Sequence, residues 1–558
     1  MKPQDIPFEA LRGTGPEVQA IEFPYRRSAD QDAATPARHP VVVVGAGPAG
    51  LSLAIDLAQR GQPVVVLDND YRLSIGSRAI CFSKRALEIW DRLGVAPRMV
   101  DKGVSWNVGK VFFHDQQVYQ FNLLPEDGHL QPAFINLQQY YAEAYLVERA
   151  LQLPLIDIRW HNKVTAVAPR AEGALVSIDT PEGAYQLDAD WLVACDGSRS
   201  PVRAMLGLES KGRIFQDRFL IADVKMQADF PTERWFWFDP PFHPHQSVLL
   251  HRQPDNVWRI DFQLGWDADP EEEKKPENIL PRVRALLGHD AQFELEWASV
   301  YTFACLRMDR FVHGRVIFAG DSAHGVSPFG ARGANSGVQD TENLAWKLDW
   351  LLKGRASEAL LATYGPEREY AADENILNST RATDFITPKS EISRLFRDAT
   401  LDLAREHEFA RRLVNSGRLS VPATLHGSVL NTPDADAFAA PRQVPGAVLL
   451  DAPVRRPDGQ DGWLLRELGA DFTLLCFGPV PAWAAGLSHV KAIGIGHDLL
   501  DPQGLVAQRL DAQPGTAYLI RPDQHVCARW RAPTEAAVRA ALATATATAA
   551  ASATATAA

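Results

Sequence analysis

The sequence predicts an α/β protein in which an antiparallel β domain is inserted into a domain built on a parallel sheet, with a smaller α/β domain near the C-terminus. Three observations support this. Four consecutive valines precede a glycine-rich turn and a helical pattern near residue 40, alternating aromatic and polar runs occupy about residues 212 to 301, and helical periodicity returns from about residue 337. With 558 residues, 46% hydrophobic and 23% charged, the chain has the composition and length of several globular domains.

Charge and cysteine content exclude several functional classes. Lys and Arg number 57 against 69 Asp and Glu, with no basic block, so we expect no nucleic-acid partner. The five cysteines form no CxxC pair, which argues against a disulfide framework and a zinc site, and no metal site is predicted. No apolar stretch has the length of a signal peptide core or a membrane span. We therefore expect a cytoplasmic protein with no membrane partner.

Ordered structure begins with a βαβ unit. The strand Val41 to Val44 has the continuous apolar character of a strand buried on both faces. Apolar residues then recur at helical spacing from Pro48 to Arg60, and Gly61 is placed to cap that helix. Val64 to Leu67 form the second strand.

The turn inside this unit reads Gly45-Ala46-Gly47-Pro48-Ala49-Gly50, a GxGxxG motif. Gly45 permits the tight turn, Gly47 lets a pyrophosphate approach the backbone, and Gly50 lets helix and strand pack closely. Asp68 follows Gly45 by 23 residues, where an acidic residue binds ribose hydroxyls. In this context the motif predicts a dinucleotide site more strongly than a tight turn that binds nothing. The predicted contacts also include Pro48, Ala49 and Asn69.

A second glycine-rich element lies far downstream. A strand from Arg315 to Ala319 runs into Gly320-Asp321, whose carboxylate can accept hydrogen bonds from a polyol. A loop then leads to a helix start where the amides of Gly333, Ala334 and Asn335 can face an anionic atom. A NAD dehydrogenase has no need for this element. A flavin does, because its ribityl chain and ring extend beyond the adenine half.

Between these two elements lies a third motif. Asp196-Gly197 follows an apolar strand, and Ser200 and Arg203 open a helical stretch. Alone, Asp-Gly is equally a turn signal. Because it lies between the other two motifs in the sequence, we interpret it as the third member of the same ordered set of motifs.

These motifs, in this order over about residues 38 to 420, resemble the FAD-dependent single-component aromatic hydroxylases. The resemblance implies that the GxGxxG turn holds the FAD diphosphate, that Asp68 binds the adenosine ribose, and that Gly320 and Asp321 bind the ribityl chain. It further implies that the third motif contacts both FAD and the reduced nicotinamide. Two other elements would contact FAD: Arg78 would approach the diphosphate, and Gln139 would approach the ribityl chain. Surface charge and a solvated helix position are the alternatives for these two. The residues so implied are Asp196, Gly197, Arg203, Ser77, Arg78, Ala79, Gln139 and Val164.

The resemblance implies an NADH- or NADPH-dependent monooxygenase that uses FAD and O2, through a flavin C4a-hydroperoxide, to hydroxylate a phenolic or related aromatic substrate. We expect this substrate to be carboxylated. Relatives are often homodimers. In the family the carbonyl corresponding to Pro328 lies near the reacting ring. Substrate contacts are expected from His251 and Arg259 on adjacent strands, or from His243 and His245, although such residues are more often satisfied within a sheet. The loop Gly330-Ala331-Arg332-Gly333 departs from the usual Gly-Gly-Gln-Gly by adding an arginine.

Competing hypotheses remain open. Trp235-Phe236-Trp237-Phe238-Asp239-Pro240 approximates a flavin-dependent halogenase motif, although Asp239 replaces an apolar residue. Trp235, Trp237 and Trp258 form either a pocket wall or sheet core. A monooxygenase acting on a larger polycyclic substrate is a further alternative. A disulfide oxidoreductase is disfavoured because Cys81 stands alone, and a non-catalytic FAD-fold protein is disfavoured by three preserved flavin motifs.

Residues 447 to 530 resemble the thioredoxin-like domain appended to phenol hydroxylases and to 3-(3-hydroxyphenyl)propionate hydroxylases. Without CxxC we expect no redox catalysis there, and we expect Cys476 and Cys527 to be buried structural thiols. The expected fold class is thus an FAD-binding Rossmann-like domain of the glutathione reductase type, an inserted antiparallel β-sheet substrate domain and a C-terminal thioredoxin-like domain. The expected boundaries are a flexible arm (1–38), FAD-binding domain in two parts (39–211 and 305–420), substrate domain (212–304), linker (421–446), thioredoxin-like domain (447–535) and disordered Ala/Thr tail (536–558).

Overall fold

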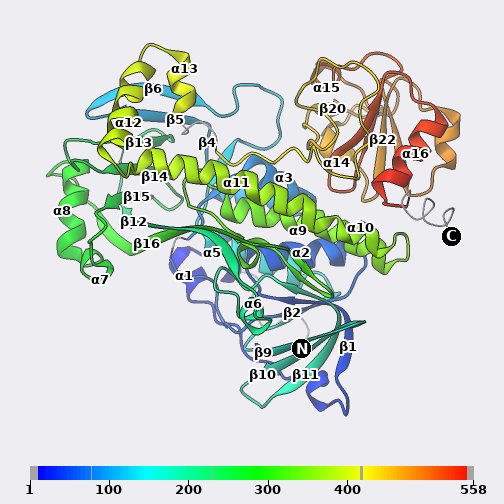
Figure 1. The fold of residues 1–558 in the computed structure, drawn as a ribbon, viewed down its shortest axis with the longest axis horizontal. Helices are drawn as coiled ribbons and strands as arrows, with labels where there is room; N and C mark the ends of the chain where they lie inside the picture. Colours follow the sequence, from blue (N-terminus) through cyan, green and yellow to red (C-terminus); the bar gives the residue numbers. More distant parts are fainter. Residues whose placement is uncertain (1–9, 77, 229, 415–418, 549–558) are drawn as a thin grey trace.

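The computed structural model describes residues 10–548 except 77, 229 and 415–418. Figure 1 shows three regions: a sheet at the bottom of the view, a second sheet on the left and a smaller domain at the upper right. Two long helices, α9 (Gly333–Leu352) and α11 (Tyr364–Ile386), run between them.

The first sheet confirms the predicted βαβ unit. Strand β1 (Ala37–Val44) pairs in parallel with β2 (Val64–Leu67) on one side and β11 (Tyr185–Ala194) on the other. Its four valines are buried, and helix α2 (Pro48–Gln59) follows the glycine turn. The described strands run in the order β17-β18-β11-β1-β2-β8, with β10 on β11 and β9 on β10. The remaining bounds are β8 (Ile156–Arg159), β9 (Lys163–Arg170), β10 (Gly173–Asp179), β17 (Val312–His313) and β18 (Val316–Phe318).

The second sheet contains all the aromatic runs that we predicted as strands, but it is wider than residues 212–304. Among the described residues its order is β19-β16-β12-β15-β14-β13-β5-β6. The last two strands come from residues 108–122, within the range expected for the FAD-binding domain. They cover the open edge of β13, and an unpaired edge is unfavourable. The bounds are β5 (Val108–Phe113), β6 (Gln116–Asn122), β12 (Ser210–Lys225), β13 (Arg234–Phe238), β14 (Ser247–Arg252), β15 (Val257–Leu264), β16 (Glu294–Met308) and β19 (His324–Gly325).

The aromatic residues of β13 divide between the two faces of this sheet, because successive side chains of a strand point in opposite directions. Trp237 and the adjoining Trp235 pack with Trp258 in one apolar cluster. Phe236 and Phe238 pack in another cluster on the opposite face. The tryptophans therefore belong to the sheet core, and the phenylalanines face the helices α11 and α12 (Glu391–Ala404).

The C-terminal domain contains a mixed sheet of β22 (Phe472–Phe477), β23 (Val490–Ile495), β24 (Ala517–Ile520) and β25 (Val526–Trp530). The described strands lie in the order β23-β22-β24-β25, with β22 parallel to β23 and β24 antiparallel to both its neighbours. These strands form the sheet of the smaller α/β domain that the sequence predicts near the C-terminus. Cys476 and Cys527 are buried, and burial raises the pKa of their thiols to about 11 and about 12. A thioredoxin-like identity stays a prediction.

Both chain ends differ from the expected flexible segments over the described residues. Near the N-terminus, Leu11, Val18 and Phe23 are fully buried, and Phe23 stacks on Trp160 at 4.2 Å between ring centroids. Near the C-terminus, helix α16 (Glu535–Ala545) forms because its alanine-rich sequence has high helix propensity and Thr534 caps it. Its apolar side buries Val538, Ala541 and Ala545 in the C-terminal core. Mixed Pro, Gly and charged residues predicted the flexible arm, and low-complexity Ala/Thr sequence predicted the disordered tail. In the described part of each segment, a few apolar residues are buried instead. Residues 1–9 and 549–558 lie outside the described residues.

Buried ion pairs attach the C-terminal domain to the two long helices. Arg521 donates to both carboxylate oxygens of Glu367 on α11, at 2.6 and 3.0 Å, and pairs with Asp523 at 2.5 Å. Lys347 on α9 donates to the same Glu367 at 2.6 Å. Because separating such pairs would leave buried charges without partners, the domain is fixed against the helices.

Helix α2 is held by a buried carboxylate whose contribution to stability depends on pH. Burial would raise the pKa of Asp56, but Arg60 and Arg92 outweigh it and lower the pKa to about 2. The stabilisation is therefore present above the unfolded pKa and is lost as the pH falls through about 2. An Asp56→Asn variant should lose about 2 kcal/mol of unfolding free energy at neutral pH, and its difference from the unmodified protein should shrink below pH 4.

Urea unfolding followed by tryptophan fluorescence at pH 7 and pH 3 measures this difference. Asp179→Asn is the matched control, because Asp179 is exposed and makes no ion pair with any described residue. A difference that stays constant from pH 7 to pH 2 would contradict the assignment.

Candidate active site

The glycine turn has the shape that a bound diphosphate needs. Gly45 has φ of 107°, and a Cβ there would lie 2.4 Å from the Cys195 carbonyl oxygen. A Cβ on Gly50 would lie 1.9 Å from the Gly45 carbonyl oxygen. At Gly47, by contrast, a Cβ would meet nothing within 4 Å. The protein therefore requires Gly45 and Gly50 for its own packing, and leaves open the position where a ligand would approach the N-terminus of α2.

Hydrogen bonds join some of the other candidate residues to this turn or to one another. The Asp68 carboxylate accepts a hydrogen bond from the Ala46 amide at 2.6 Å, and burial raises the pKa of Asp68. The Gln139 carbonyl oxygen accepts from the Ala79 amide at 3.0 Å. Arg78 and Asn69 are exposed, and Val164 is buried in the core. Ser77 lies outside the described residues.

The second glycine-rich element meets the first one directly. Gly320 has φ of 66°, and a Cβ there would lie 3.2 Å from the Ala49 side chain. A Cβ on Gly337 of α9 would lie 3.1 Å from the Gly320 Cα. Two segments about 270 residues apart in sequence are thus in close contact, and Gly337 of α9 lies next to both.

A buried charge cluster that the sequence did not reveal holds this loop. Asp340 of α9 accepts hydrogen bonds from the Gly320 amide at 3.0 Å, the His324 ring at 2.6 Å and Arg368 at 2.6 Å. Burial would raise the pKa of Asp340, but His324 and Arg368 outweigh it and lower the pKa. Asp340 therefore stays ionised and positions the Gly320-Asp321 backbone. In the sequence, Asp340 is recognisable only as a polar residue within a helix.

The third motif contacts the second. The Asp196 carboxylate accepts from the Val202 amide at 2.9 Å. Arg203 donates to the carbonyl oxygens of Ser198 and Ser322, each at 2.7 Å. Gly197 has φ of 81° and open space at its Cβ position. Arg203 thus links the Asp-Gly turn to the loop that carries Asp321.

The start of α9 is pinned by a side chain rather than left free. The Asn335 amide group accepts from the Ser83 amide at 2.9 Å and donates to the Cys81 carbonyl oxygen at 2.9 Å, so it binds strand β3 (Cys81–Ser83). The additional Arg332 is 3% exposed and donates to Asn375 of α11 at 3.0 Å. The backbone of Gly333 and Ala334 remains beside Asp321, because a Cβ on Gly333 would lie 3.9 Å from an Asp321 carboxylate oxygen.

Asp321 is exposed to solvent, yet surrounding protein atoms desolvate it enough to raise its pKa. These two properties are typical of a carboxylate on the wall of a recess.

Replacing Asp321 by alanine should weaken FAD binding about tenfold, because a charge-assisted hydrogen bond contributes about 1.5 to 3 kcal/mol. Fluorescence titration of the flavin-free protein measures the change. Asp309→Asn, an exposed residue paired with Lys211, is the control, and equal FAD affinity in both variants would remove Asp321 from the site.

A mainly aromatic pocket lies between the second sheet and α11, next to the loop after Asp321. Its free volume is about 30 Å³, room for about one water molecule, so a ring enters only when side chains rotate. The loop contributes Phe329 and Gly330, which adjoin Pro328. The Pro328 carbonyl oxygen accepts from the Ala331 amide at 3.0 Å. The lining residues are Lys110, Phe121, Arg234, Phe236, Phe238, Phe329, Gly330, Ala382, Phe385, Ile386, Val414 and Leu419.

Arg234 is the residue of this pocket that sequence analysis missed. It is 8% exposed, and its Nη1 atom is buried without a hydrogen-bond partner among the described residues. Burial lowers the pKa of its guanidinium, and Asp261 partly opposes this. A buried cation with an unpartnered donor is costly unless a ligand supplies the anion. The signal available in the sequence was that Arg234, a charged residue, begins an aromatic strand.

His251 and Arg259 lie directly opposite each other on β14 and β15, as expected. Arg259 is occupied, since it donates to Asp261 at 3.2 Å and to the Arg78 carbonyl oxygen at 3.0 Å. Burial, Arg234 and Arg259 together lower the pKa of His251 well below its usual value, so its ring is neutral near pH 7. Neither residue lines the aromatic pocket. His243 donates to the Gln263 carbonyl oxygen at 2.7 Å, and His245 is exposed. Neither histidine lines the pocket.

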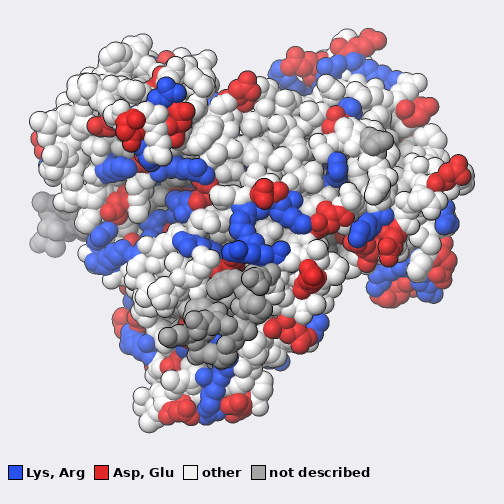
Figure 2. Space-filling view, turned by 180° about the vertical axis from the view of Figure 1, so that it is seen from behind, with Lys and Arg blue, Asp and Glu red and all other residues white. Residues whose placement is uncertain are grey.

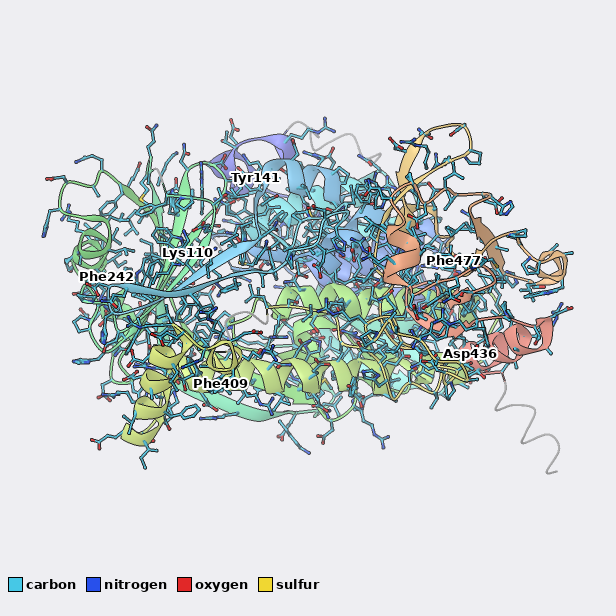
Figure 3. The ribbon with its side chains drawn as sticks, turned by 90° about the horizontal axis from the view of Figure 1, so that it is seen from above. Lys110, Tyr141, Phe242, Phe409, Asp436 and Phe477 are labelled. Carbon is cyan, nitrogen blue, oxygen red and sulfur yellow. The ribbon has the colours of Figure 1, made fainter. Side chains whose placement is uncertain are left out.

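Figure 3 shows Lys110 on β5 at the end of the molecule that also carries α13 (Glu408–Leu413) with Phe409. Lys110 pairs with Glu233 at 2.7 Å and lies over the Trp235 ring. Arg234 is therefore the pocket cation without a protein counter-charge in direct contact.

The open position at Gly47, the recessed Asp321 and the junction of all three motifs fit a flavin dinucleotide. Gly45, Gly47 and Gly50 with the N-terminus of α2 would hold its diphosphate, Asp68 its ribose, and Asp321 with the start of α9 its ribityl and ring end. The fold and the site thus define a flavoprotein.

Comparison with known proteins supports the conclusion that this is a flavoprotein. A family model described as FAD binding domain matches residues 38–379, and the chain belongs to this family. It is 31% identical over 408 residues, 71% of this chain and 73% of the relative, to a probable NADH-specific resorcinol 4-hydroxylase of Rhodococcus jostii (strain RHA1). It is 27% identical over 523 residues, 88% of this chain and 90% of the relative, to a 3-(3-hydroxy-phenyl)propionate/3-hydroxycinnamic acid hydroxylase of Mycobacterium sp. (strain JLS). It is an FAD-dependent aromatic hydroxylase.

The fold is shared along nearly the whole chain. The flavin-dependent monooxygenase PieE, solved with FAD and substrate, has a TM-score of 0.77 at 22% identity and covers 92% of this chain and 100% of its own. The p-nitrophenol 4-monooxygenase PnpA from Pseudomonas putida DLL-E4 has a TM-score of 0.61 at 25% identity, covering 69% of this chain and 100% of its own. Within the described residues, no helix has both the length and the apolar character that crossing a membrane requires.

Figure 2 shows acidic and basic side chains interspersed over the face that it presents.

Proposed function

We propose that this protein hydroxylates a phenol that carries a carboxylated side arm, with NADH or NADPH as reductant and O2 as oxygen source. The observation that carries the phenol is Arg234, a buried guanidinium with an unpartnered donor in a pocket of five phenylalanines. The carboxylated arm follows the name of the related 3-(3-hydroxy-phenyl)propionate/3-hydroxycinnamic acid hydroxylase. When bound, reduced flavin supplies an electrophilic oxygen atom derived from O2.

Arg234 would favour the ionised form of the substrate hydroxyl. A cation a few ångströms from a phenol oxygen stabilises the phenolate more strongly in a dry pocket than in water. A phenolate ring is much more nucleophilic than a phenol ring, so this increases its reactivity towards electrophilic oxygen. His251, being neutral and weakly basic, is the poorer group for this purpose and would act only as a hydrogen-bond partner.

The aromatic side chains would orient the ring and exclude water. Phe236 and Phe238 stand on the sheet side, and Phe385 stands on α11. Ring pairs of this kind favour offset or edge-on contact with an aromatic ligand. The loop that follows Asp321 contributes Phe329 and Gly330 to the pocket wall, which would place the substrate ring beside the bound flavin.

A panel of phenols and aromatic acids, scored for both NAD(P)H consumption and hydroxylated product, tests the proposal. We expect stoichiometric product with at least one phenol carrying a carboxylated arm, and little consumption with the corresponding non-phenolic acid. Consumption that yields only hydrogen peroxide across the panel would overturn it. Cytoplasmic action is part of the proposal and is supported by the free thiols of all five cysteines.

A further inference from the structure

A large groove lies outside the aromatic pocket, and the same side chains form the wall between them. The groove has a volume of about 1090 Å³ and runs between β6 and the helices α11, α12 and α13. Phe121, Phe385 and Val414 line both spaces. The pocket itself is too small for a ring, and Phe121 and Phe385, whose rotation would enlarge it, also line the groove.

The groove has an apolar wall that a folded chain would ordinarily bury. Ile392 and Phe396 of α12 are 80% and 58% exposed, and Leu413 of α13 is 50% exposed. All three line the groove. Large apolar side chains gathered in one concave surface mark a binding site more often than single exposed residues do.

The groove is also basic. Among its described lining residues are four arginines and two carboxylates. Arg412 pairs with Glu408 at 2.6 Å, and Arg411 donates to backbone carbonyl oxygens. Arg381 has no hydrogen bond or ion pair with any described residue and is exposed on α11, one residue from pocket-lining Ala382. The groove therefore complements a ligand that is apolar along its length and negatively charged at its end.

We propose that this groove is a second substrate subsite that binds the arm of an elongated phenolic acid while the phenol ring occupies the aromatic pocket. The inference rests on the proposed function and extends it from a phenol with a short carboxylated arm to one with a long apolar arm ending in an anion. The arm passes Phe121 and Phe385, lies on Ile392 and Phe396, and presents its carboxylate to Arg381.

The test compares four probes: 3-ethylphenol, 3-(3-hydroxyphenyl)propanoate, 8-(3-hydroxyphenyl)octanoate and 8-(3-hydroxyphenyl)octan-1-ol. We expect the octanoate to have the lowest KM, at least tenfold below that of 3-ethylphenol, with the uncharged octanol intermediate. An Arg381→Ala variant should raise the ratio of KM for the octanoate to KM for the octanol about tenfold. An Ile392→Ser/Phe396→Ser variant should raise KM for both long probes relative to 3-ethylphenol.

Arg394→Ala is the matched control, because Arg394 is exposed on the same α12 helix but does not line the groove. If short phenols are hydroxylated and chain length leaves KM unchanged, the subsite is wrong while the proposed function stands. If no phenol is hydroxylated, the proposed function itself fails, and direct binding of the octanoate by calorimetry still decides the subsite. A concentration-dependent dimer that the Ile392→Ser/Phe396→Ser variant dissociates would assign the groove to a second copy and overturn the inference.

Discussion

A Gly47→Val variant is expected to bind FAD at least a hundredfold more weakly, equivalent to about 2.7 kcal/mol, and to purify colourless. The reason is steric: a side chain at Gly47 meets no protein atom within 4 Å, so it projects into the space that the diphosphate would take. The flavin-free protein should lose only about 1 kcal/mol, because the residue caps α2 in an extended conformation that valine adopts.

Two other glycines separate this effect from a folding defect. Gly50→Ala should prevent folding, because its Cβ would lie 1.9 Å from the Gly45 carbonyl oxygen. Gly265→Ala, at an open position far from the turn, should change neither stability nor flavin affinity. FAD affinity by fluorescence titration and the thermal midpoint of the flavin-free protein measure both properties. A Gly47→Val protein that retains flavin would show that the diphosphate lies elsewhere.

An Arg234→Met variant is expected to lose about a hundredfold in kcat/KM with phenols, since truncating a charged hydrogen-bond donor to a buried anion costs about 2 to 3 kcal/mol. The acidic limb of its kcat profile against pH should move to higher pH, because the bound phenol hydroxyl would lose the cation that favours its ionisation. The flavin-free protein should be at least as stable as the unmodified one, because methionine removes an unpartnered buried charge.

Arg259→Met provides the contrast. Arg259 donates to Asp261 and to the Arg78 carbonyl oxygen, so its loss leaves a buried carboxylate without that cation and should destabilise the fold by about 3 kcal/mol. Urea unfolding and steady-state kinetics distinguish the two arginines. If Arg234→Met unfolds more easily and keeps its kcat/KM, Arg234 is a structural residue and the substrate anion binds elsewhere.

Much of the fold was predictable because its signals are local. The valine run, the glycine turn and the following helical spacing specify β1 and α2 within a single stretch of chain, and the two-residue alternation specifies the strands of the second sheet. The addition of β5 and β6 to that sheet was not predictable, because periodicity identifies a strand and not its partner. The chain ends were misjudged because polar composition outweighed Phe23 and Val538, whose burial depends on distant surfaces.

The residues of the candidate site also fall into two groups: those that the sequence indicated and those that it did not. The glycines and Asp321 carry motifs whose spacing follows from the shape of the flavin, so the sequence pointed to them. Asp340 and Asn335 act through partners about 20 and 250 residues away, and nothing in their own neighbourhood indicates this. The sequence placed His251 and Arg259 on adjacent strands, and the structure shows that they lie opposite each other. Which arginine lacks a counter-charge depends on the side chains that the neighbouring strands contribute.

The sequence by itself determined the FAD-binding class of this protein and the strand, turn and helix that would hold a diphosphate, because those features depend on backbone conformation within a few residues. Only the tertiary structure decided that Arg234 is the cation without a counter-charge, that the aromatic pocket shares a wall with a groove lined by four arginines, and that Asp340 holds the Gly320 loop. Burial and charge balance are properties of residues brought together from distant parts of the chain, so they exist only once the chain has folded.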